Sequence, residues 1–196
     1  MKKIILAGPI LFAVVVVTLT IVEYDFLRGL GWHPIKDPTY DWPSGIALDP
    51  HTGWIMKLTF IISGLLISLL GYQLKADLKP DHDSKIGTAL LFGAGLAMAC
   101  LVFETDPTRR TTPMTWHGIL HDLSFVVLGL TLMPSMIFLG KAFRDNPHWR
   151  NLVKYTWGTA ALALPTFFLK GLFFYVFLLA ILTWVEVIAI RLQQTE

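Results

Sequence analysis

Long apolar runs alternate with short polar segments along the whole chain. Six of these runs approach the roughly 20 predominantly apolar residues that a membrane-spanning helix needs. They cover residues 4–23, 53–74, 86–104, 116–140, 152–169 and 171–190. We therefore expect an all-α integral membrane protein, with residues 1–196 forming a single domain built as a bundle of six transmembrane helices.

The basic residues between these runs predict how the bundle is oriented. With the N-terminus inside, ten of the 16 Lys and Arg residues fall on the inner side and six on the outer side. Cytoplasmic loops carry the excess of basic residues in membrane proteins. We expect a multi-pass protein of the prokaryotic cytoplasmic (inner) membrane, with both the N-terminus and the C-terminus in the cytoplasm.

The first outer segment, residues 24–52, is the longest polar stretch. It contains Trp32, Trp42 and four prolines. Loops of this length without secondary structure are uncommon in compact proteins, and aromatic residues argue against disorder. We expect a long structured loop that folds back over the outer mouth of the bundle. The competing interpretation is an interfacial segment whose tryptophans lie at the level of the lipid headgroups.

Small residues indicate which helix lies at the centre. The third run carries Ala89, Gly93 and Ala97 at four-residue spacing, with Gly95 and Ala99 beside them. Small residues at this spacing allow helix backbones to approach closely in lipid. The third helix is therefore expected to be central, packed through this stripe.

Composition agrees with a membrane protein and excludes some partners. The chain is 54% hydrophobic, with a mean hydropathy of +0.59 and only 15% charged residues. The formal charge of +2 and the absence of a basic patch interleaved with aromatics exclude nucleic acid as a partner. Cys100 is the single cysteine, so no intrachain disulfide can form. The expected partners are the lipid bilayer, subunits of a membrane complex or further copies of the chain.

Most ionisable residues of the apolar runs gather at their predicted outer ends. Ionisable groups inside a membrane are costly, so each is a functional hypothesis. Lys57 lies about one turn into the second helix and Glu104 ends the third, and we expect the two to form an ion pair, with Glu23 as the alternative partner. The other members are Asp25, Asp106, His117, His121 and Asp122.

His117 and His121 form the sharpest pattern in this set. Residues four apart lie on one face of a helix, and this is the spacing at which two histidines can share a metal ion. A divalent metal would need a further ligand, for which Glu104 is a candidate. The competing interpretation gives the two histidines a hydrogen-bonded structural role or a contact with a lipid headgroup.

Two neighbouring motifs carry a family resemblance. Phe103-x-x-Asp106-Pro107 and Thr115-x-x-Gly118-x-x-His121 resemble the signature of a bacterial and archaeal membrane family, domain of unknown function 998. The resemblance spans essentially the whole chain and implies that Asp106, Thr115, Gly118 and His121 belong to a shared motif. It implies no activity, and it makes His117 an addition of this sequence, which weakens a metal site as a general function of the family.

Three classes of function follow from these patterns. The favoured one is a non-enzymatic protein that binds a lipid headgroup or small ligand at an outward-facing polar pocket, or that serves as a subunit of a larger complex. Its ligand-binding residues would be Asp25, Trp42, Asp106, Thr115 and His121. A metal-dependent intramembrane hydrolase would use His117, His121 and Glu104. A proton- or ion-coupled transporter would use Glu23, Glu104 and Asp122.

Overall fold

The chain folds as a bundle of long helices. The computed structural model describes residues 2–33, 36, 38, 43–107, 114–169 and 171–194, and within these ranges it contains helices and no strand. The α-helices are α1 (Ala7–Val22), α2 (Tyr24–Gly29), α3 (Gly53–Asp77), α4 (His82–Ala99), α5 (Trp116–Arg144), α6 (Val153–Phe168) and α7 (Gly171–Gln193). Short 3-10 helices are η1 (Lys2–Leu6), η2 (Pro43–Leu48), η3 (Cys100–Val102) and η4 (Arg150–Leu152).

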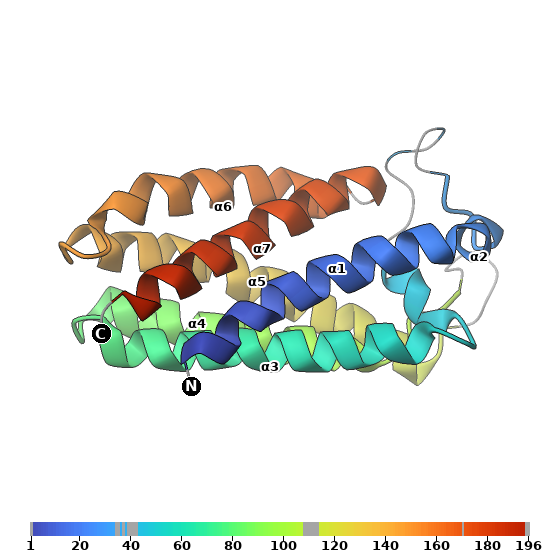
Figure 1. Cartoon of the computed structure of the whole chain (residues 1–196), viewed down its shortest axis with the longest axis horizontal. Helices are drawn as coiled ribbons and strands as arrows, with labels where there is room; N and C mark the ends of the chain where they lie inside the picture. The colour runs from blue at the N-terminus through green and yellow to red at the C-terminus, as the bar shows by residue number, and fades with distance from the viewer. Residues whose placement is uncertain are drawn as a thin grey trace.

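The long helices run up and down the bundle. α1, α4 and α6 run in one direction and α3, α5 and α7 return in the other, so both chain termini lie toward the same end (Figure 1). We call this the terminal end, and the opposite end, which α2 and η2 occupy, the outer end. Short polar connections at the terminal end join α3 to α4 and α5 to α6.

Five helices are long and apolar enough to cross a membrane. They cover Lys3–Val22, Gly53–Asp77, His82–Val102, Trp116–Arg144 and Gly171–Gln193. The sixth expected span, residues 152–169, is also helical, but α6 has only 16 residues. At 1.5 Å per residue this helix is roughly 24 Å long, which is less than the ~30 Å of a typical hydrocarbon core.

The tightest helix contact joins α3 to α4. A Cβ atom added to Gly95 would lie 2.4 Å from the backbone nitrogen of Ser68 and 2.5 Å from the carbonyl oxygen of Gly64. The two backbones therefore touch, and Ser68 Oγ adds a 3.0 Å hydrogen bond to the carbonyl oxygen of Phe92. Such close approach is the usual source of helix association in lipid, where hydrophobic burial contributes little.

Only part of the expected stripe on α4 makes helix contacts. Ala89 is exposed, and a Cβ at Gly93 would meet only the Thr131 methyl group, at 3.8 Å. The close contact instead uses Gly95 toward α3 and Gly87 toward α5, where a Cβ would lie 2.9 Å from the Leu139 backbone nitrogen. α4 thus packs between α3 and α5, and its close contacts use the expected Gly95 but not Ala89 or Gly93.

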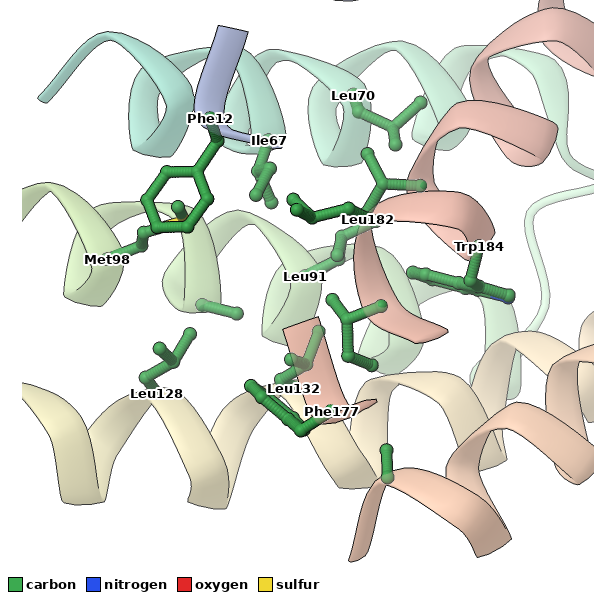
Figure 2. Close-up of a cluster of buried hydrophobic side chains, with 14 of the residues drawn as sticks. Phe12, Ile67, Leu70, Leu91, Met98, Leu128, Leu132, Phe177, Leu182 and Trp184 are labelled. Carbon is green, nitrogen blue, oxygen red and sulfur yellow. The ribbon is translucent and has the colours of Figure 1, made fainter. Parts of the chain in front are cut away.

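Apolar side chains fill the middle of the bundle. Figure 2 shows this core, in which α1, α3, α4, α5 and α7 all contribute side chains. Its labelled members are Phe12, Ile67, Leu70, Leu91, Met98, Leu128, Leu132, Phe177, Leu182 and Trp184, all of them buried. Trp184 also donates a 3.1 Å hydrogen bond to Thr156 Oγ1, which joins α7 to α6.

Hydrogen bonds also hold the terminal end together. Trp149, fully buried in the connection between α5 and α6, donates from Nε1 to Asp77 Oδ2 at 2.9 Å. Its ring stacks on Phe143, with centroids 4.9 Å apart. The neighbouring His148 lies with Nε2 at 3.2 Å from the carbonyl oxygen of Arg191, so the ends of α3 and α7 are both tied to this connection.

A matched pair of substitutions tests the α3–α4 contact. Gly95→Ala should lower the free energy of unfolding by about 1–3 kcal/mol, because its methyl group must push two backbones apart. Gly93→Ala, two residues along the same helix, should be neutral or slightly stabilising, since its Cβ has room and alanine favours a helix. Thermal denaturation in detergent compares the two variants, and equal stabilities would contradict the packing described above.

Candidate functional site

Exposed aromatic residues lie near both ends of α3 and at the start of α5. Trp54 on α3 and Trp116 on α5 are 59% and 63% exposed at the outer end. Tyr72, 18 residues after Trp54 on α3, is 61% exposed near the other end. Eighteen residues of helix span roughly 27 Å, close to the thickness of a hydrocarbon core, and Trp and Tyr favour its two boundaries. The aromatic residues of α3 are therefore spaced as expected for a helix that crosses a membrane.

Lys57 and Glu104 form an ion pair at the outer end of the bundle. Lys57 Nζ donates a hydrogen bond to Glu104 Oε1, joining α3 to the segment that follows η3. The two side chains are 29% and 48% exposed, so both charges can be reached from outside the bundle. This pair unites two of the site residues expected from the sequence.

Asp106 caps the first turn of α5. Thr115, the N-cap residue, donates from Oγ1 to Asp106 Oδ1 at 2.7 Å and from its backbone nitrogen to Oδ2 at 3.2 Å. The same Oγ1 accepts the backbone N–H of Gly118 at 3.1 Å. A carboxylate at a helix N-terminus is favoured by the exposed N–H groups and by the helix dipole.

Gly118 explains the glycine of the Thr-x-x-Gly pattern. A Cβ atom at this position would lie 2.1 Å from Asp106 Oδ2 and 2.5 Å from the carboxyl carbon. Only a residue without a side chain lets the carboxylate rest on the first turn of α5. Asp106, Thr115 and Gly118 are therefore parts of one cap.

His121 holds the other side of the same connection. Its side chain is buried, and Nδ1 lies 2.8 Å from the carbonyl oxygen of Phe103 and 3.2 Å from that of Leu101. Both partners are acceptors, so Nδ1 carries the hydrogen and donates it. His121 thereby binds backbone carbonyls at the end of η3, where helical hydrogen bonding stops.

A second polar network joins α1 to the start of α3. Thr52 Oγ1 lies 3.0 Å from Glu23 Oε1 and 3.2 Å from Asp49 Oδ1. Asp49 Oδ1 accepts the backbone N–H groups of His51 and Thr52, each at 2.8 Å. Burial acts to raise the pKa of Asp49, but these hydrogen bonds outweigh it and hold the pKa below its ordinary value.

Parts of the 24–52 segment pack onto the outer end. Trp32 is buried, with its ring 5.9 Å from that of Tyr24 and 6.2 Å from that of Tyr175 on α7. Tyr175 is in turn hydrogen-bonded to Thr20 on α1, at 2.8 Å. The described part of this segment is thus attached to both α1 and α7.

Three expected site residues are not among the contacts described above. Asp25 is on α2, exposed, with Oδ1 4.0 Å from Arg28 Nη1. Trp42 lies outside the described residues. The His117 ring packs against Trp116, with centroids 3.6 Å apart.

The described residues do not assemble the expected metal ligands. No group of three or more His, Cys, Asp or Glu side chains suited to a metal ion occurs within them. Glu104 is paired with Lys57, and Nδ1 of His121 faces the Leu101 and Phe103 carbonyl groups. His117, His121 and Glu104 therefore have separate surroundings.

The sequence reasoning missed Asp49 and Thr52. Their signal was present, because Asp49-Pro50-His51-Thr52-Gly53 places two hydrogen-bonding side chains and a proline directly before an apolar run. The sequence analysis assigned these residues to the long outer segment and did not identify them as the start of α3.

One family matches this chain. The family described as protein of unknown function (DUF998) matches residues 5–191, and the chain belongs to it. No curated protein and no solved structure matches the chain.

The contact between Asp106 and Gly118 can be tested by a double-mutant cycle. Gly118→Ala alone should destabilise the protein by about 1–3 kcal/mol, because the methyl group displaces the capping carboxylate. In an Asp106→Ala background the same substitution should cost much less, since the obstructing carboxylate is gone. Free energies of unfolding of the four proteins give the coupling. Additive effects would show that Asp106 does not lie on Gly118.

Proposed function

We propose that this member of the family is a six-pass protein of the prokaryotic cytoplasmic membrane that binds a lipid headgroup or small polar ligand at its outer end. Both termini lie in the cytoplasm in this proposal, and the protein binds its ligand without catalysing a reaction. The observation that carries it is the Lys57–Glu104 pair, which offers both signs of charge at headgroup level.

The arrangement of the helices supports six crossings. An even number of crossings brings both termini to one side, and both termini lie toward the same end of the bundle (Figure 1). α6 runs beside α5 and α7 and connects the two ends, although it is short. The excess of basic residues near the terminal end favours the cytoplasm for that side.

The chemistry of the Lys57–Glu104 pair favours a zwitterionic ligand. A ligand that carries an ammonium group and a phosphate can place each charge on the opposite member of the pair. Phosphoethanolamine, the headgroup of a common membrane lipid, has this character. The exposed Trp54 and Trp116 lie at the membrane boundary where such a headgroup resides. Asp25 and Trp42 are proposed as further contacts from the 24–52 segment.

The family motif serves this site by positioning Glu104. Phe103, directly before Glu104, is held through its carbonyl group by His121. Asp106, two residues after Glu104, is held by Thr115. Glu104 is thus fixed between two anchors opposite Lys57. In this proposal Asp106, Thr115 and His121 are positioning residues, and Glu104 and Lys57 contact the ligand.

Cysteine labelling tests the topology on both sides of α6. In a Cys100→Ala background, Arg150→Cys should react with a membrane-impermeant maleimide only after the membrane is permeabilised. Leu169→Cys, which follows α6 and is 42% exposed, should react in intact cells. Labelling of both positions from the same side would show that α6 does not cross the membrane.

Lipid-dependent stability tests the ligand site. Phosphatidylethanolamine added to the purified protein at about 100 times its dissociation constant should stabilise it by about 2.7 kcal/mol. Glu104→Gln should lose most of that gain because the ligand's ammonium group loses its partner. Asp83→Asn, which removes a carboxylate at the terminal end, serves as the control and should keep the gain. Equal gains in all three proteins would refute the site.

A further inference from the structure

The terminal end carries an open hollow lined mostly by cations. Its volume is about 380 Å³, and its lining comes from the end of α5, from η4 and from the start of α6. Three of the five lining residues are basic: Arg144, Arg150 and Lys154, with Asn151 and Val153 completing the wall. Asp145 lies beside them, with Oδ1 3.9 Å from Arg144 Nε. The hollow has a net positive charge and lies at the opposite end of the bundle from the outer site.

A backbone contact orients one of the cations. Arg150 Nε donates a 3.2 Å hydrogen bond to the carbonyl oxygen of Arg144, which links η4 to the end of α5. The guanidinium group has two terminal NH2 groups besides Nε, and their planar arrangement matches two oxygens of a phosphate. Arg150 is therefore held through Nε, and its two terminal NH2 groups are not used by this hydrogen bond.

An apolar stripe on α6 leads away from the hollow into the membrane. Trp157 and Leu164 follow Lys154 on one face of the helix and are 38% and 51% exposed. Trp157 Nε1 also donates to the carbonyl oxygen of Ile137 at 3.3 Å, which fixes its ring against α5. A cationic hollow at the start of such a stripe complements a molecule with an anionic head and an apolar tail.

We propose that this hollow binds the phosphate of an anionic phospholipid, with Arg144, Arg150 and Lys154 as its contacts and the α6 stripe along its acyl chain. A free phosphate would use the cations but not the stripe. A zwitterionic lipid would place its ammonium group among three cations, which is unfavourable. The inference rests on the proposed topology only in assigning the lipid to the cytoplasmic leaflet, and it does not depend on the outer ligand site.

The test compares three probes on the purified full-length protein in detergent. Phosphatidylglycerol, phosphatidylcholine and inorganic phosphate are titrated into the Glu104→Gln variant, so that zwitterionic lipid bound at the proposed outer site contributes little, and the thermal midpoint is recorded. Phosphatidylglycerol should raise the midpoint, and the other two probes should raise it little. The double variant Arg150→Gln/Lys154→Gln should bind phosphatidylglycerol about 25-fold more weakly, from roughly five-fold for each cation near a membrane surface.

A matched control removes two positive charges from the terminal end at positions outside the hollow. Lys75→Gln/Lys85→Gln takes two exposed cations from the same end of the bundle, on α3 and α4, and should keep the wild-type response. If the first double variant does not fold, Lys154→Gln alone leaves the Arg150–Arg144 bond intact and should weaken binding about five-fold.

Three results would overturn the proposal. The first is an equal response to phosphatidylglycerol and phosphatidylcholine. The second is an unchanged response to phosphatidylglycerol in the Arg150/Lys154 variants. The third is a response to inorganic phosphate as large as that to phosphatidylglycerol, which would indicate a free-phosphate site. The detergent assay does not depend on membrane orientation, so a wrong topology would appear in the cysteine labelling and not here.

Discussion

The backbone contact between α3 and α4 sets the geometry of the outer site. In lipid there is no hydrophobic driving force between apolar helices, so close packing of their backbones must fix their relative position. Gly64 and Gly95 mark the point of contact. Seven residues back along α3 from Gly64 lies Lys57, and nine residues beyond Gly95 lies Glu104. A different register between the two helices would separate these charges.

Register alone does not bring Glu104 to Lys57, because α4 and η3 end before Glu104 is reached. The connection to α5 leaves backbone carbonyl groups unsatisfied at the end of η3, and α5 begins with unsatisfied N–H groups. His121 binds the carbonyl groups, and Asp106 binds Thr115 at the start of α5. Meeting these local hydrogen-bonding requirements also holds Glu104 in place. The family motif therefore positions a charged pair that it does not itself contact.

The sequence predicted the positions of the helices well because spanning lipid requires long apolar runs. It placed the start of the third helix four residues late, since Asp81 and Ser84 form a polar capping box before the apolar run begins. It also included Ala89 and Gly93 among the contacting small residues of that helix, and these two do not pack closely. When both neighbours and lipid are apolar, hydrophobicity does not reveal which face packs, and only the backbone approach at Gly95 distinguishes it. The His117–His121 spacing likewise could not show that a ring nitrogen of His121 faces carbonyl groups.

The distribution of polar groups favours separate binding surfaces over a path across the membrane. A transporter needs polar groups that continue from one side to the other, and such groups within membrane helices mark ion and substrate pathways. Here the charged networks occupy the outer end and the cationic hollow the terminal end. The middle of the bundle is filled by the buried apolar side chains that Figure 2 shows. Within the described part of the chain, Glu186 Oε2 is buried without a hydrogen-bond partner. One buried carboxylate oxygen does not form a continuous path of polar groups across the membrane. The positions of the polar groups therefore fit the proposed binding of lipid at both ends of the bundle better than coupled transport.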